Sequence, residues 1–199
     1  MGQKLSKEFY QRDDVISIAK DLLGKLLIRN LNGVLTSGII VETEAYHPEE
    51  MASHAFQRRR TKRNSIMFEE GGVAYVFMNY GIHYLFNVVT NIKEEPDAIL
   101  IRALQPVSGL ETMMVRRNKT ADSRITSGPG ALSKAMAIDL NLNGESLLGE
   151  KIWIENDNSL DLSNYNMVSS KRVGVEYAGE HASLPWRFYF KNNPWISKP

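Results

Sequence analysis

The chain has 199 residues, 43% of them hydrophobic and 24% charged, and its net charge of +1 at pH 7 provides no overall attraction to a polyanion. The length fits one domain spanning residues 1–199, and the apolar share suffices for a sizeable core, which excludes an intrinsically disordered chain. The absence of cysteine excludes disulfides, thiolate nucleophiles and cysteine-ligated metal sites, and no apolar run approaches the roughly 18 residues that cross a membrane.

The first half of the chain predicts a helix followed by paired strands. Asp13 or Asp14 can cap a helix that runs to about Leu23 and closes at Gly24, because apolar residues recur there at helical spacing. A strand is predicted at residues 25–30. Asn32-Gly33 then gives the strongest hairpin signal in the chain and leads into a long strand at residues 34–46. Residues 47–73 are charged, turn-rich and irregular.

The second half continues the pattern of strands with few helices. Residues 71–90 predict two strands around Asn79-Tyr80-Gly81, and residues 98–104 another buried strand. Helices are predicted near residues 109–116 and 130–138, and strands at residues 151–155, 172–177 and 186–190. This order of elements predicts an α+β fold: a single domain with a curved, mostly antiparallel sheet, flanking helices and a protruding β-hairpin.

Two glutamates on the long strand are candidates for catalysis. Glu42 and Glu44 lie two residues apart, so their side chains share one face of a strand. Two like charges side by side repel, which requires a raised pKa or a cationic partner. The simpler alternative is the outward polar face of an edge strand. The strand ends at Tyr46, before an irregular segment that carries His54, and chemistry tends to sit where a rigid strand meets such a loop.

Arg102 and Asn87 interrupt otherwise apolar strands. A buried arginine needs an acidic partner or a charged ligand. A buried amide must form hydrogen bonds within the protein or with the polar edge of a ligand. A purely structural pairing fits this pattern as well as a functional one. The four histidines are scattered and form no HExxH pair, so we expect neither a metal nor a cofactor.

Tyr80 and a nearby basic run are candidates for contact with nucleic acid. Aromatic residues at alternate strand positions usually pack in a core, but Tyr80 sits at the predicted hairpin tip, where an aromatic wedge can enter a base stack. The basic run usually indicates a solvated face, yet it also suits gripping a few phosphates. Its members are Arg58, Arg59, Arg60, Lys62 and Arg63.

Seven segments follow the order and spacing of one family. They are IVETEAY (40–46), NSIMF (64–68), YVFMNYGIHYLFN (75–87), ILIRALQP (99–106), SGPGALSKAMAI (127–138), RVGVEYAGE (172–180) and PWRFYF (185–190). Together they resemble the alkyladenine (3-methyladenine) DNA glycosylase family from about Leu22 to Ser197. Each motif alone is weak, but seven in register are very specific.

The resemblance implies a catalytic role for Glu44 and Arg102. Glu44 would activate the water that attacks the anomeric carbon, and Arg102 would help to hold that water and the nearby backbone. Tyr80 would fill the gap left by a nucleotide flipped out of the duplex. A carboxylate suits this reaction, because positive charge develops on the sugar in the transition state.

The resemblance also implies a pocket for the flipped base. Tyr46, His54 and Phe77 would line it and stack on the base, each good cation–π contact favouring a cationic alkylated purine by about 0.5–2 kcal/mol. Asn87 would disfavour bases with an extra amino group. Phe77 departs from the family pattern, because the family can carry tyrosine there, so stacking would survive without the hydroxyl.

The expected function is therefore a monofunctional glycosylase of base excision repair, with duplex DNA containing damaged purines as its partner. No lysine stands out as a Schiff-base nucleophile, so the product would be an abasic site. Alkylated purines are the expected lesions, with deaminated and etheno purines as further candidates. We expect a monomer without membrane contact, in the cytoplasm and, in a prokaryote, associated with the nucleoid.

Two alternatives remain open from the sequence. A non-catalytic module would recognise damaged nucleic acid through the same aromatic pocket, and its binding would survive the loss of Glu44. A carbohydrate hydrolase would use Glu42 and Glu44 as its acid pair, about 7 Å apart by strand rise. The basic run, Tyr80 and the matched motifs argue against the second alternative.

Overall fold

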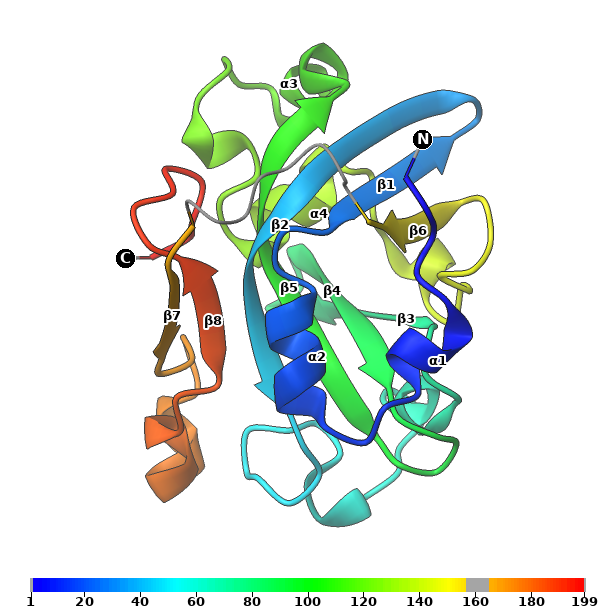
Figure 1. The fold of residues 1–199 in the computed structure, drawn as a ribbon, viewed down its shortest axis with the longest axis vertical. Helices are drawn as coiled ribbons and strands as arrows, with labels where there is room; N and C mark the ends of the chain where they lie inside the picture. The colour runs from blue at the N-terminus through cyan, green and yellow to red at the C-terminus, as the bar shows by residue number, and fades with distance from the viewer. Residues whose placement is uncertain (1, 157–164, 199) are drawn as a thin grey trace.

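The computed structural model describes residues 2–156 and 165–198, in which eight strands form one antiparallel sheet (Figure 1). The path of neighbours is β3-β4-β5-β2-β1-β6, with β8 paired to β2 and β7 paired to β8. The strands are β1 (Leu26–Leu31), β2 (Val34–Tyr46), β3 (Ala74–Asn79), β4 (His83–Thr90), β5 (Asp97–Ser108), β6 (Ile152–Glu155), β7 (Met167–Ser170) and β8 (Arg187–Phe190). The predicted α+β fold with a curved, mostly antiparallel sheet is confirmed.

Strand β2 is the centre of the sheet, because it pairs with β1, β5 and β8. Its register with β5 shifts twice between Ile40 and Thr43. Ile40 pairs with Leu104 and Glu42 with Ala103, so Val41 of β2 has no partner in β5. Thr43 pairs with Ile101, so Arg102 of β5 has no partner in β2. Such bulges bend a strand and redirect side chains. The bulge at Arg102 therefore places this side chain beside the two glutamates of β2.

Short helices cover the sheet. The α-helices are α1 (Lys7–Tyr10), α2 (Val15–Asp21), α3 (Leu110–Arg117) and α4 (Pro129–Ala135). Helix α2 packs against β2 and β5, and α4 packs against β4, β5 and α3. The 3-10 helices are η1 (Phe56–Arg58), η2 (Ser65–Phe68), η3 (Ser123–Ile125), η4 (Leu140–Leu142) and η6 (Glu176–Ser183). Among the described residues, no helix combines the length and hydropathy needed to span a bilayer.

Local sequence signals account for most element boundaries. Asp14 caps α2 by accepting hydrogen bonds from the main-chain N–H groups of Ile16 (2.9 Å) and Ser17 (3.0 Å). Asn32 and Gly33 both take positive φ, 53° and 86°, which the tight β1–β2 turn requires. The predicted hairpin forms from β3 and β4, and its protrusion from the sheet stays a prediction.

The predicted strand at residues 172–177 is wrong. Gly174 takes a φ of 77°, and the chain turns into the 3-10 helix η6 at Glu176. The main-chain N–H of Val173 donates to Glu44 at 2.7 Å instead of to a neighbouring strand. Val175 packs in a small cluster with Ala52 and Ala178. The alternating apolar residues of this segment therefore pack within a loop and do not form a strand. The strand that pairs with β8 here is β7.

Candidate active site

A cavity of about 280 Å³ opens where β2, β3 and β4 meet the loops that follow β2 and β7. The predicted base-contacting residues Tyr46, His54, Phe77 and Asn87 all line it, together with Arg102 and Tyr80. The structure thus gathers six of the predicted site residues around one space, although they come from four strands and two loops.

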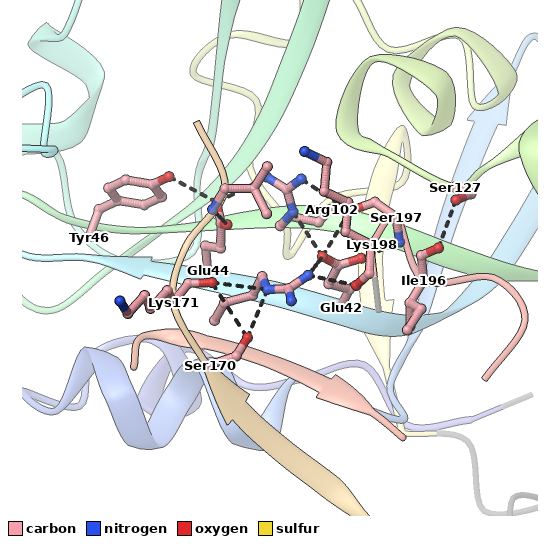
Figure 2. A network of polar contacts seen from close by, with 12 residues as sticks. Glu42, Glu44, Tyr46, Arg102, Ser127, Ser170, Lys171, Ile196, Ser197 and Lys198 are labelled. Carbon is pink, nitrogen blue, oxygen red and sulfur yellow. Dashed lines mark hydrogen bonds and ion pairs between the residues drawn. The ribbon is translucent and has the colours of Figure 1, made fainter. Parts of the chain in front are cut away.

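Glu44 is not itself among the described residues that line this cavity, but its carboxylate accepts hydrogen bonds from three residues that do: Tyr46, Arg102 and Val173. Figure 2 shows Glu44 with Tyr46 and Arg102. Its Oε1 accepts the main-chain N–H of Val173 at 2.7 Å. Its Oε2 accepts the phenol of Tyr46 at 2.9 Å and Nη1 of Arg102 at 3.1 Å. The residue is 0% exposed. These three donors fix the orientation of the carboxylate, and a carboxylate in its ionised form accepts a proton from water.

Glu42 is buried as well, so the alternative of an outward polar edge is wrong for this pair. Its Oε1 accepts Nε of Arg102 at 3.0 Å, Nη1 of Arg187 at 2.9 Å and the Ser197 hydroxyl at 2.8 Å. Its Oε2 accepts the main-chain N–H of Ser197. The expectation of a cationic partner for the two like charges is confirmed, with two guanidinium groups beside two carboxylates.

Arg102 bridges the two glutamates. Burial by itself would lower the pKa of the Arg102 guanidinium, but the charges of Glu44 and Glu42 raise it above the ordinary value. The side chain is 6% exposed and remains charged. A buried arginine with this many charged partners is stable only as part of the whole cluster, because removing one partner leaves an uncompensated charge.

The walls of the cavity are aromatic. The rings of His54 and Phe77 meet edge to face with centroids 4.5 Å apart, and Nδ1 of His54 lies 2.9 Å from the phenol oxygen of Tyr75. Burial raises the pKa of Tyr75 to about 12. The guanidinium of Arg172 lies 4.8 Å from the ring centroid of Tyr46.

Burial and the charge of Arg63 lower the pKa of His54 to about 4. The imidazole is therefore neutral near pH 7, although His54 as a residue stays exposed at the rim of the cavity. A neutral ring can stack on a cationic base without charge repulsion. The pKa of Tyr46 is also raised, first by burial and then by the charge of Glu44, so its phenol stays protonated and able to donate.

Asn87 sits on β4 with 4% of its surface exposed. Its Nδ2 donates to the main-chain oxygen of Tyr75 at 3.1 Å. Among the described residues, its Oδ1 has no hydrogen-bond partner in the protein. The amide is thus anchored through one end, and the other end is free to contact a base in the cavity it lines.

Tyr80 lies in the three-residue loop between β3 and β4 and is 87% exposed. Its φ of 49° is uncommon for a bulky residue. The loop therefore presents the ring to solvent at the rim of the cavity, as a wedge requires. Its role in DNA binding stays a prediction.

The basic run divides into paired and unpaired charges. Arg58 and Arg60 form ion pairs of 2.7 Å with Glu95 and Glu94. Arg63 lies 5.0 Å from the ring centroid of Phe77 and donates to the main-chain oxygen of Met78 at 3.2 Å. Within the described part of the chain, the side chains of Arg59 and Lys62 have no carboxylate partner. Arg59 and Lys62 are therefore more available to bind a phosphate than Arg58 and Arg60.

Several residues of the site were not predicted. Val173 contributes its main-chain N–H, which leaves no signal in the side chain. Arg172 forms a buried ion pair of 2.6 Å with Glu50, and Arg187 lies in the apolar β8. Arg187, like Arg102, is a charged residue inside an apolar segment, and this pattern is the signal by which it could have been identified.

Among the described residues, no group of three His, Asp or Glu side chains is arranged to hold a metal ion. No lysine is among the described residues that line the cavity. The side chains present at the cavity include those of an arginine, two asparagines and several aromatic residues, with the Glu44 carboxylate hydrogen-bonded to three of the lining residues.

Comparison with known proteins gives one consistent result. A family model described as methylpurine-DNA glycosylase matches residues 8–194. A protein of Natranaerobius thermophilus, provisionally named a 3-methyladenine DNA glycosylase, is 47% identical over 198 residues that cover 98% of both chains. Proteins with the same provisional name from Carboxydothermus hydrogenoformans and Desulfitobacterium hafniense are 45% and 42% identical, again over 98% of both chains.

Proposed function

The chain belongs to the methylpurine-DNA glycosylase family, and from this premise we propose that it is a monofunctional glycosylase of base excision repair. It takes an alkylated purine out of duplex DNA, hydrolyses the bond between the base and deoxyribose, and leaves an abasic site. The observation that carries the proposal is the carboxylate of Glu44, buried and held by three donors beside an aromatic cavity.

The proposed mechanism assigns two tasks to Glu44. Cleavage of the glycosidic bond passes through a sugar with oxocarbenium character, which a nearby carboxylate stabilises. The same carboxylate takes a proton from the water that attacks the anomeric carbon. Tyr46, Arg102 and the Val173 N–H hold the Glu44 carboxylate and fix its orientation, so little reorganisation is needed during the reaction.

The proposed base pocket selects flipped purines by stacking and charge. Flipping costs a few kcal/mol and costs less for a damaged or mispaired base. Tyr46, His54 and Phe77 offer neutral aromatic faces, which attract a cationic base. Tyr80 occupies the gap in the duplex, and phosphate contacts by the basic run offset part of the cost.

The cavity favours lesions that leave without help from an acid. His54 has a pKa near 4, so almost none of it is protonated at pH 7, and the raised pKa of Tyr46 and Tyr75 makes both phenols poor proton donors. N-alkylated purines are already cationic and leave readily. We therefore propose that they are better substrates than neutral lesions such as hypoxanthine and ethenoadenine.

The two alternatives are less well supported. A carbohydrate hydrolase would need Glu42 as an acid or nucleophile, but its two oxygens already accept four hydrogen bonds from Arg102, Arg187 and Ser197. A non-catalytic recognition module would need Glu44 only as a charge partner of Arg102, and the family to which the chain belongs favours catalysis. We propose a monomer that acts on duplex DNA in the cytoplasm and, in a prokaryote, associates with the nucleoid.

The test is release of free base from duplexes that carry one methylated purine, one ethenoadenine or one hypoxanthine. The proposal predicts release that is fastest for the methylated purine, with strands that stay intact until treated with alkali. Tight lesion binding without release of any base would instead support the recognition module. Strand cleavage before alkali treatment would contradict the monofunctional reaction.

A further inference from the structure

Residues 195–198 lie beside the buried cluster formed by Glu42, Glu44, Arg102 and Arg187. Figure 2 shows Ile196, Ser197 and Lys198 of this segment. The Ser127 hydroxyl donates to the main-chain oxygen of Ile196 at 2.8 Å, and Arg187 donates to that of Lys198, also at 2.8 Å. Trp195 and Ile196 pack against the main core. The segment is therefore held at several points, and its position is fixed relative to the sheet.

Ser197 is the residue of this segment that enters the cluster. Its hydroxyl accepts Nη2 of Arg102 at 3.0 Å and donates to Oε1 of Glu42 at 2.8 Å. Its main-chain N–H donates to the other oxygen of Glu42. One serine thus closes a ring of hydrogen bonds between the arginine and the glutamate.

This ring leaves Arg102 a single orientation. Nε bonds to Glu42, Nη2 bonds to Ser197, and Nη1 is left pointing at Glu44, at distances of 3.0, 3.0 and 3.1 Å. A planar guanidinium fixed by two neighbours has no freedom to turn its third nitrogen away. The Nε of Arg187 donates to the Ser170 hydroxyl at 2.9 Å, and its Nη1 donates to Glu42. The positive charge of Arg187 therefore compensates the second carboxylate of the cluster.

We propose that Ser197 and Glu42 are positioning residues for the reaction, acting through Arg102 on the catalytic Glu44. The inference rests on the proposed function and assigns a role to the second glutamate of the pair. The segment of residues 195–198 then belongs to the active site, although none of its residues is among those that line the cavity. Ser197 affects the rate of bond cleavage and not the binding of the lesion.

Ser197→Ala is the decisive variant, because Glu42→Gln leaves buried arginine charge uncompensated and can fail to fold. We expect Ser197→Ala to lower the single-turnover rate of base release about 10-fold, with lesion affinity changed less than about twofold. Ser197→Thr keeps the hydroxyl and should restore most of the rate. Ser183→Ala is the matched control, because the Ser183 hydroxyl is exposed and, within the described residues, bonds only to the main-chain oxygen of Glu180.

A second measurement separates this inference from the proposed function. The Nη2–H resonances of Arg102, whose Nη2 donates to the Ser197 hydroxyl, should shift or broaden in NMR spectra of Ser197→Ala and stay unchanged in Ser183→Ala. A wild-type rate in Ser197→Ala, or an unchanged Arg102 resonance, overturns the positioning role. A fall in rate matched by an equal fall in lesion affinity also overturns it. A wild-type protein that releases no base refutes the proposed function, while the resonance still tests the hydrogen bond between Ser197 and Arg102.

Discussion

The phenol of Tyr46 donates a 2.9 Å hydrogen bond to Oε2 of Glu44, two residues earlier on the same strand. Residues at this spacing share one face of a strand, so a wall of the cavity and the proposed catalytic carboxylate are joined directly. The guanidinium of Arg172 stacks over the Tyr46 ring, and its own ion pair with Glu50 anchors the loop after β2. A base that stacks on Tyr46 is therefore placed in a fixed relation to Glu44.

Tyr46→Phe separates the two roles of this residue. The ring is kept and the donor to Glu44 is removed, and hydrogen bonds to charged groups contribute about 1.5–3 kcal/mol. We expect single-turnover base release to slow about 10- to 100-fold while lesion affinity stays within about twofold. Tyr165→Phe is the control, since the Tyr165 ring packs on Phe190 outside the cavity. Equal decreases of rate and affinity would show that the hydroxyl acts in binding instead.

His54 should titrate far below an ordinary histidine. Its folded-state pKa is about 4, against about 6.5 in an unfolded chain. The stability that the neutral ring contributes is therefore complete above about pH 6.5 and is lost as the pH falls toward 4. An NMR titration of the ring protons measures the midpoint directly.

Arg63→Gln should raise that midpoint, because it removes the positive charge that opposes protonation. Lys151→Gln is the control, since Lys151 directly precedes β6 and pairs with Glu145. A midpoint near 6.5 in the wild type, or no response to Arg63→Gln, would refute the account of a desolvated neutral ring.

Tyr80→Ala should weaken binding to lesion duplex. Stacking of an aromatic side chain on a base contributes about 1–3 kcal/mol, which corresponds to a decrease in affinity of roughly 5- to 150-fold. Binding is measured with a duplex that carries a non-hydrolysable abasic analogue. Val115→Ala, at a similarly exposed apolar site on α3, is the control. Unchanged affinity in Tyr80→Ala would remove the wedge from the mechanism.

Arg59 and Lys62 should contribute phosphate contacts. Replacing both with Gln should lower affinity for all duplexes and reduce the salt dependence of binding, with a log–log slope that is smaller by up to about 0.9 for each phosphate no longer neutralised. Arg58 and Arg60, which are paired with carboxylates, should give smaller changes. A decrease confined to particular sequences would contradict phosphate binding, and Lys151→Gln again serves as the control.

Much of the fold follows from the sequence because its signals are local. The cap at Asp14, the Asn32-Gly33 turn and the strand at Val34–Tyr46 depend on neighbouring residues only. The predicted strand at residues 172–177 fails because the main chain of Val173 bonds to Glu44, 129 positions away. A periodic pattern carries no information about a partner at that distance, so an apolar alternation in a loop is indistinguishable from a strand.

The parts of the site that consist of charged side chains were predictable from the sequence. The buried charge of Arg102 and the spacing of Glu42 and Glu44 indicated a cluster, although the bulge that brings Arg102 to them is a property of strand pairing. Ser197 gave no signal, because an isolated serine has many ordinary roles. Its place in the cluster depends on the contacts of Ser197 with Glu42 on β2 and Arg102 on β5, which only the folded chain reveals.

The most direct test of the account compares wild type and Glu44→Gln in base release from a methylated-purine duplex. The substitution keeps the size of the side chain, removes the negative charge and the proton acceptor, and leaves Arg102 paired with Glu42, so retained lesion binding shows that the variant folds. Since a positioned base contributes about 10²–10⁴-fold, the account predicts a single-turnover rate at least about 100-fold lower, with lesion binding nearly unchanged. Release by Glu44→Gln at the wild-type rate would contradict the assignment of Glu44 as the group that activates water.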